Sequence, residues 1–225
     1  EISECLVGSE MCIRDSNTIL VLVSSFPYTI NWSQEHVPAI VHITHCSQEQ
    51  GNGLADVLFG KVNPAGRTVQ TWVKDITDLP DIMDYDIRNG RTYMYHQGPV
   101  LYPFGYGLSY SDFTYEKIES FKQDKKNIRV TVSVKNTSGR DGEEVVQLYA
   151  SYPESKVERP SKQLRAFRRL PIKAGETRKV TLTVPKEELG YWNEGKQMFV
   201  VEPGTVKLLI GASSEDIRLE GKIRL

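Results

Sequence analysis

The segment Val100-Leu-Tyr-Pro-Phe-Gly-Tyr-Gly-Leu-Ser-Tyr110 divides the 225-residue chain into two parts of different character. One proline and two glycines exclude a helix here, because proline costs about 3 kcal/mol and glycine about 1 kcal/mol relative to alanine in a helix interior. Four tyrosine or phenylalanine side chains carry large apolar surfaces that favour burial, which excludes a flexible linker. We therefore predict an ordered strap, packed in the seam between a mixed α/β part upstream and an all-β part downstream.

The part upstream of the strap has the pattern of a mixed α/β fold. Two short apolar runs, 18–24 and 39–44, are rich in Val, Ile and Leu, which is typical of strands buried on both faces of a parallel sheet. The other elements predicted for this part are helical turns over 32–37, a loop over 45–51, a helix over 52–59 ended by Gly60, a turn over 63–66, a strand over 67–72 and, after a loop-rich stretch, a turn into a short strand over 89–95.

From Phe113 onward the apolar residues recur with a period of two. In the stretch 128–135, Ile or Val alternates with Arg, Thr, Ser or Lys, so one face is apolar and the other polar. Further strands are predicted over 145–152, 163–170, 180–184, 198–201, 206–210 and 217–225. Seven or so short strands in a segment of this length indicate a β-sandwich.

These patterns predict four successive segments. Residues 1–16 show neither helical nor strand periodicity and contain Cys5 and Cys12; we expect a non-native or disordered segment, with a redox pair of these two cysteines as the alternative. They also lack the charged start and apolar run of a signal peptide. We expect a partial α/β sandwich domain over 17–80, the interdomain strap over 81–112, and an all-β sandwich domain over 113–225.

The two halves of the chain carry opposite charge. Residues 1–112 hold 6 Lys and Arg against 13 Asp and Glu, whereas residues 113–225 hold 22 against 16. Opposite signs favour docking of the halves, although exposed ion pairs contribute little individually. The basic residues alternate with apolar ones along strands, as on a solvated sheet face, so we expect no nucleic-acid partner. No run of about 20 apolar residues is present, so we expect no membrane span.

The loop over 45–51 holds the best-placed polar cluster, because ligands of open α/β sheets bind beyond the carboxyl ends of the strands. His42, His45 and Cys46 resemble a metal cluster, but side chains three apart on a strand point to opposite faces. We therefore expect a structural histidine, a small buried thiol at Cys46, and neither a metal nor another cofactor. For Glu49 we expect bonds to backbone amides at the helix start or a pair with Arg67, with substrate contact as the alternative.

Aromatic residues in the all-β part offer a second candidate site. They are Tyr149, Tyr152, Tyr191 and Trp192. Such residues form sugar-stacking platforms in some proteins, but more often they plug the end of a sandwich or pack on a neighbouring element. We expect packing here.

Three motifs in order resemble glycoside hydrolase family 3, the family of β-glucosidases and β-xylosidases. They are Gln48-Glu-Gln-Gly-Asn-Gly-Leu-Ala-Asp-Val-Leu-Phe-Gly60, Asn63-Pro-Ala-Gly-Arg67 and Tyr102-Pro-Phe-Gly-Tyr-Gly-Leu-Ser-Tyr110. The similarity runs from about Asn17 to Leu225 and implies the C-terminal part of a longer enzyme. It also implies a fibronectin type III-like module over 113–225, whose pattern Glu144-Val-Val-Gln-Leu-Tyr149 and Val201-Glu-Pro-Gly204 fit.

The resemblance implies a retaining, exo-acting enzyme that hydrolyses β-linked glucosides or xylosides. In the family the nucleophile is an aspartate of an N-terminal barrel domain, and the acid/base is a glutamate upstream of the position that matches residue 17. We therefore assign no catalytic residue and no substrate-binding residue to this chain, and expect it to be inactive without the missing barrel. The segment 79–93 is closer to the β-xylosidase branch, and family members are often secreted or periplasmic. The alternative function is a stand-alone carbohydrate-binding or scaffolding module.

Overall fold

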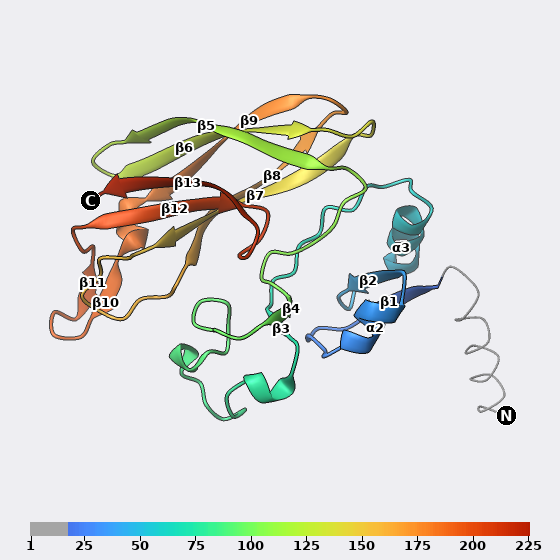
Figure 1. Ribbon diagram of the computed structural model, residues 1–225, viewed down its shortest axis with the longest axis horizontal. Helices are drawn as coiled ribbons and strands as arrows, with labels where there is room; N and C mark the ends of the chain where they lie inside the picture. Colours follow the sequence, from blue (N-terminus) through green and yellow to red (C-terminus); the bar gives the residue numbers. More distant parts are fainter. Residues whose placement is uncertain (1–17) are drawn as a thin grey trace.

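The computed structural model describes residues 18–225. Figure 1 shows a two-layered β-sandwich, a smaller α/β part, and an extended region around β3 and β4 that runs between them. The α/β plus all-β architecture predicted from the sequence is therefore confirmed. The expectations for residues 1–16 lie outside the described residues and stay predictions, as do the boundaries at residues 80 and 112.

The α/β part consists of two parallel strands and two helices. Strand β1 (Ile19–Val23) pairs with β2 (Ala39–Ile43), and α2 (Asn31–His36) lies between them in sequence. Helix α3 (Gln50–Leu58) follows β2, and Gly60 ends it in the left-handed conformation at φ 71°. The predicted strands, helical turns and helix are all present, with α3 starting two residues earlier than predicted.

The expected burial of β1 and β2 on both faces is wrong. Ile19 is 43% exposed and Val23 is 42% exposed, and no residue of either strand is fully buried. The physical reason is that this sheet has two strands in the described part of the chain, so its apolar side chains lack a complete covering layer.

The segment between α3 and β4 contains less strand than predicted. Of the strand expected over 67–72, only its last residue belongs to β3 (Trp72–Val73), which pairs with β4 (Val100–Tyr102) of the strap. The short strand expected within 89–95 is absent from the structure: the amides of Tyr95 and His96 both donate to the carbonyl of Thr92, which closes a turn. Two short 3₁₀ helices, Ile76–Asp78 and Ile87–Asn89, complete this segment.

Aspartates order the segment 74–88. Asp75, Asp81, Asp84 and Asp86 each accept a hydrogen bond from the backbone amide two residues further on, at 2.8 to 3.0 Å. These bonds are Asx turns, in which the side chain offers the backbone a partner that a helix or sheet would otherwise supply. They explain why this stretch is ordered although it contains only two short 3₁₀ helices, which Asp75 and Asp86 cap.

The sandwich consists of two antiparallel sheets that face each other (Figure 1). One sheet has the order β5-β6-β9 and the other the order β13-β12-β7-β8. A small hairpin of β10 and β11 is attached to one end, after a 3₁₀ helix, Lys186–Leu189. The strand bounds are β5 Phe113–Gln123, β6 Asn127–Asn136, β7 Gly142–Ser151, β8 Gln163–Ile172, β9 Thr177–Pro185, β10 Tyr191–Asn193, β11 Met198–Val200, β12 Thr205–Gly211 and β13 Ile217–Arg224.

The core lies between the two sheets and confirms the predicted apolar face of β6, although Ser133 of the predicted polar face is also buried, where it donates to Glu119. Ile128, Val130, Val132 and Val134 of β6 are all 0% exposed and face buried side chains of β7 and β12. Full burial of one such side chain stabilises the fold by about 1.5–3 kcal/mol. The sandwich therefore has a core built from its own residues, from its strands and from Leu189 of the 3₁₀ helix.

Candidate functional site

A cavity of about 530 Å³ opens where the parallel strand β2 meets α3. Its apolar wall is formed by Val41 and Ile43 of β2 and by Leu54 and Val57 of α3, and its polar rim is the loop 46–50. The loop therefore lies beyond the carboxyl end of β2, as the sequence predicts, and it is the candidate ligand site of the α/β part.

Glu49 lies on the polar rim of this cavity, but it bonds neither to the backbone amides at the start of α3 nor to Arg67, the two partners predicted for it. Its Oε2 accepts a hydrogen bond from the side chain of Asn52 at 2.5 Å, and it makes no side-chain bond to a backbone amide at the start of α3. Arg67 pairs with Glu144 instead. Both expectations for Glu49 are therefore wrong, because its hydrogen-bond donor is the side-chain carboxamide of Asn52, three residues along the chain.

His42 points away from the loop and into the structure. Its Nε2 lies 3.2 Å from the Ser24 hydroxyl and 3.1 Å from the Ser24 carbonyl oxygen, and its ring meets the edge of Trp72 at a centroid distance of 5.0 Å. Cys46 is exposed, so the expectation of a buried thiol is wrong. Among the residues that the structure describes, no three His, Cys, Asp or Glu side chains form a group that could hold a metal ion.

The number of carboxylates in the cavity limits the chemistry that it can support. A retaining glycosidase needs two carboxyl groups roughly 5–5.5 Å apart, one as nucleophile and one as acid/base. Among the described residues that line this cavity, Glu49 is the single carboxylate. The cavity can therefore contribute to recognition of a ligand, but it does not contain a glycosidase pair.

The strap contacts both parts of the chain. On the α/β side, Tyr102 packs against Trp72 with ring centroids 5.6 Å apart, and the Tyr110 hydroxyl donates to the carbonyl of Val57 at 2.9 Å. On the sandwich side, the amide of Ser214 donates to the carbonyl of Phe104 at 2.9 Å. The strap is therefore an ordered connection, although not all of it is buried, since Leu108 is 72% exposed.

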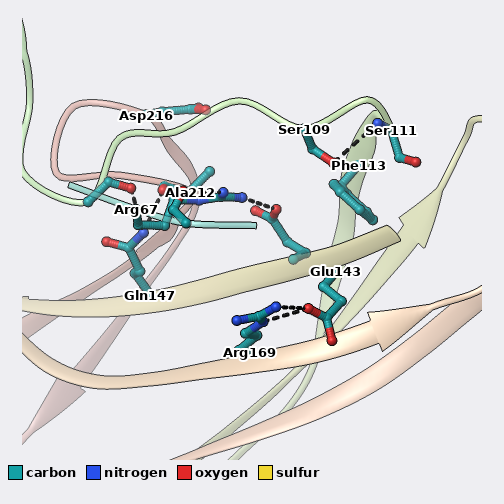
Figure 2. Close-up of polar contacts among 12 residues, drawn as sticks. Arg67, Ser109, Ser111, Phe113, Glu143, Gln147, Arg169, Ala212 and Asp216 are labelled. Carbon is teal, nitrogen blue, oxygen red and sulfur yellow. Dashed lines mark hydrogen bonds and ion pairs between the residues drawn. The ribbon is translucent and has the colours of Figure 1, made fainter. Parts of the chain in front are cut away.

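Gln147 of β7 anchors the strap to the sandwich (Figure 2). Its Nε2 donates to the carbonyls of Gly105 at 3.0 Å and Ala212 at 2.5 Å, and its Oε1 accepts from the buried Tyr149 hydroxyl at 2.5 Å. Gly105 adopts a left-handed φ of 82°, and a Cβ there would collide with the Gln147 side chain. The glycine is thus required both by the backbone conformation and by the close approach.

A buried ion pair links the turn over 63–66 to the sandwich. Arg67 Nη2 donates to Glu144 Oε2 at 2.7 Å, and the other carboxylate oxygen accepts from the Tyr115 hydroxyl at 2.9 Å. Burial raises the pKa of Tyr115 well above its usual value, and the negative charge of Glu144 acts in the same direction. Among the ion pairs of residues 18–225, this pair alone joins the halves 1–112 and 113–225. Its positive residue, Arg67, belongs to the half with net negative charge, and its negative residue, Glu144, belongs to the half with net positive charge.

Asn63 completes the junction. Its Nδ2 donates to the Ser111 hydroxyl at 2.8 Å and to the carbonyl of Asp141 at 2.9 Å, while its Oδ1 accepts from Ser109 and Tyr110. Sequence reasoning missed Asn63, Glu144 and Gln147 as junction residues. The available signal was a pair of polar residues, Glu144 and Gln147, within the stretch 144–150, whose other residues are apolar.

The four aromatic residues of the sandwich do not form one platform. Tyr149 is fully buried and meets Tyr93 edge to face at 6.0 Å. The guanidinium of Arg159 stacks on Tyr152 at 3.6 Å and lies 5.6 Å from the Tyr191 ring. Trp192 is 48% exposed and packs against Phe199 of the same hairpin. All four therefore contact packing partners within the fold, as expected, although Trp192 stays half exposed.

With this geometry established, comparison with protein families gives two matches. Residues 8–110 match the glycosyl hydrolase family 3 C-terminal domain, and residues 144–214 match the fibronectin type III-like domain. The first match starts upstream of the expected limit near Asn17, so the similarity includes part of the segment 1–16. None of the helices in the described part of the chain is long and apolar enough to cross a membrane.

The similar proteins and solved structures are named as β-glucosidases. The chain is 32% identical to a probable β-glucosidase H of Aspergillus flavus, covering 99% of this chain and 29% of that protein. It is 36% identical to a β-glucosidase of Rhizobium radiobacter, covering 93% of this chain and 28% of that protein. The crystal structure of a β-glucosidase from Kluyveromyces marxianus matches with a TM-score of 0.89 and 32% identity, over 98% of this chain and 28% of that chain.

The chain thus spans less than a third of the length of these relatives, at their C-terminal end. The order of the two matched domains, the α/β part and then the β-sandwich, is the order seen in the fold. The chain belongs to glycoside hydrolase family 3, of which it contains the C-terminal domain and the fibronectin type III-like module.

Proposed function

We propose that this chain is the C-terminal part of a retaining, exo-acting β-glucosidase that hydrolyses O-glycosidic bonds in carbohydrate metabolism. The support is the name shared by the similar proteins, β-glucosidase, which favours glucosides over xylosides as substrates. The likeness of the segment 79–93 to β-xylosidases favours xylosides, but it rests on a short loop. Both catalytic carboxylates belong, in this proposal, to the barrel domain and its connection to the α/β part.

The observation that carries the proposal is the junction between the two parts. The strap, the Gln147 amide and the buried Arg67–Glu144 pair fix the sandwich against the α/β part, which contains the loop over 46–50 and its cavity. A sandwich held in this way serves the enzyme as a rigid support for the α/β part. The single carboxylate of the cavity, Glu49, is proposed to help shape the site but not to act on the glycosidic bond.

A chimera tests the proposal. The chain would replace its matching part in the β-D-glucoside glucohydrolase of Trichoderma reesei, to which it is 32% identical with a TM-score of 0.85. We expect the chimera to hydrolyse an aryl β-glucoside with retention of anomeric configuration, and at least tenfold faster than an aryl β-xyloside. A folded chimera that prefers the xyloside would refute the glucoside assignment. A folded chimera that hydrolyses neither substrate would refute the supporting role of this chain.

The second candidate function is a stand-alone carbohydrate-binding module. One observation favours it: the hairpin of β10 and β11 exposes Trp192 by 48% and Phe199 by 66%, and such aromatic surfaces can stack on sugar rings. Affinity electrophoresis of the chain in a gel containing soluble β-glucan separates the two functions. If the glucan retards the parent chain but not Trp192→Ala, the binding function is supported. If the parent chain migrates without retardation, the binding function is refuted and the hydrolase proposal stands.

A further inference from the structure

The open edge of the sandwich carries a groove that the proposed hydrolase function does not use. Strand β8 is the last strand of one sheet and β9 is the last strand of the other, so both edges are unpaired on this side. Between them lies a groove of about 510 Å³. This volume lies within the range of small-molecule sites and is enough for one or two sugar rings.

Arg165, which lines this groove, lies at a β-bulge of β8. Leu148 of β7 pairs with Ala166, whereas the next residue, Tyr149, pairs with Leu164, so Arg165 is the extra residue. Bulges redirect side chains and are frequent beside binding sites. Arg165 donates to Gln163 and Tyr152, but its Nε is buried without a hydrogen-bond partner in the described chain.

The groove has an excess of positive charge. Arg165 and Arg168 both line it, against Glu188 as its one carboxylate. No ion pair within residues 18–225 involves any of these three side chains. Burial is the chief cause that lowers the pKa of Arg159, and the positive charge of Arg165 acts in the same direction. Neither groove arginine is therefore paired with a carboxylate in the described part of the chain.

The other lining groups suit a sugar ring. Phe167 is 66% exposed and offers an apolar face to the C–H groups of a pyranose. Thr181 and Thr183 of β9 line the same groove. The Thr181 hydroxyl already shares a hydrogen bond with the Thr131 hydroxyl at 2.8 Å, so Thr183 offers the hydroxyl that can donate to or accept from a ligand. Charged residues on an edge strand also prevent pairing with other chains. That role requires neither the threonines nor the exposed aromatic ring.

We propose that this groove binds a saccharide that carries a carboxylate, such as a uronic acid. The guanidiniums of Arg165 and Arg168 would bind the carboxylate by charge-assisted hydrogen bonds, and Phe167 would stack on the ring. The site is distinct from the cavity beside Glu49 and does not depend on the proposed hydrolytic activity.

Saturation-transfer NMR on the full chain at low ionic strength tests this site, with D-glucuronate as the probe and D-glucose and inorganic phosphate as comparisons. We expect glucuronate to bind, and Arg168→Gln or Arg165→Gln to weaken its binding about tenfold, the usual effect of losing one charge-assisted hydrogen bond. Arg169→Gln is the matched control, because Arg169 is on the same strand but pairs with Glu143 outside the groove (Figure 2). It should bind glucuronate as the parent chain does.

Three results would overturn the proposal. They are equal binding of glucose and glucuronate, binding of phosphate as tight as that of glucuronate, and glucuronate binding that neither arginine substitution weakens. Arg168 is exposed, so Arg168→Gln keeps the test informative even if Arg165→Gln lowers the melting temperature.

Discussion

Arg67 and Glu144 form an ion pair of 2.7 Å whose side chains are only 9% and 3% exposed, although 77 residues separate them in the sequence. Breaking such a pair leaves one buried charge without a partner, which typically costs about 3–5 kcal/mol. We expect Arg67→Met to lower the free energy of unfolding of the full chain by this amount, measured by urea denaturation.

The neighbouring residue supplies the control for this prediction. Glu143 pairs with Arg169 on the exposed face of β7 and β8, where an ion pair contributes about 0–1 kcal/mol. Glu143→Gln should therefore change the free energy of unfolding only slightly. Equal effects of Arg67→Met and Glu143→Gln would contradict the view that the Arg67–Glu144 pair holds the two parts together.

Gly105 is predicted to be intolerant of a side chain. It combines a φ of 82° with a close approach to Gln147, so Gly105→Ala adds a steric clash to the cost of about 1–2 kcal/mol for a left-handed alanine. Gly175→Ala is the matched control: its φ is 71°, but nothing lies within 4 Å of the added Cβ. Thermal unfolding should show a clearly larger loss for Gly105→Ala, and similar losses would mean that the approach to Gln147 relaxes freely.

The turn between β5 and β6 is predicted to lose stability in acid. Asp124 accepts hydrogen bonds from the amides of Asn127 and Lys126 and from Arg129, which lower its pKa from 3.8 to about 2. Because the folded pKa is below the unfolded one, this contribution is complete above pH 3.8 and is lost as the pH falls through about 2. Asp124→Asn should therefore lower the melting temperature at pH 6, and the difference from the parent chain should shrink towards pH 2. A difference that stays constant would contradict the assigned pKa.

The alternation of apolar and polar residues in a strand such as β6 is enough to predict the sandwich, because burial of one face sets the phase. The same reasoning overestimated the burial of β1, because the number of strands beside it is not encoded locally. It also missed the bond from Glu144 to Arg67, since a polar residue in an apolar strand does not reveal a partner 77 residues away. The junction is held by contacts between segments that are distant in sequence, and hydrophobic periodicity does not predict such contacts.

Residues 113–225 are predicted to fold alone, whereas residues 17–112 are not. The buried cluster of the sandwich runs from Tyr115 to Ile210 and takes no residue from the α/β part. The α/β part has two half-exposed strands with unpaired edges, which favour aggregation. Expression of the two segments separately checks this, by solubility and by the cooperativity of thermal unfolding. A soluble 17–112 segment that melts cooperatively would show that the α/β part is complete as it stands.

The last prediction concerns activity. Loss of the nucleophile or of the acid/base of a glycosidase removes covalent or proton-transfer assistance, and in this chain we assign neither role to any residue. We expect the 225-residue chain to hydrolyse aryl β-glucosides and β-xylosides no faster than buffer alone. Within the complete chimera, Glu49→Gln should then change the rate far less than replacement of the barrel aspartate, because Glu49 bonds to Asn52 and lies in a cavity without a second carboxylate. If the isolated chain cleaved these substrates and Glu49→Gln abolished the cleavage, the chemistry would belong to the loop at 46–50 and not to the barrel.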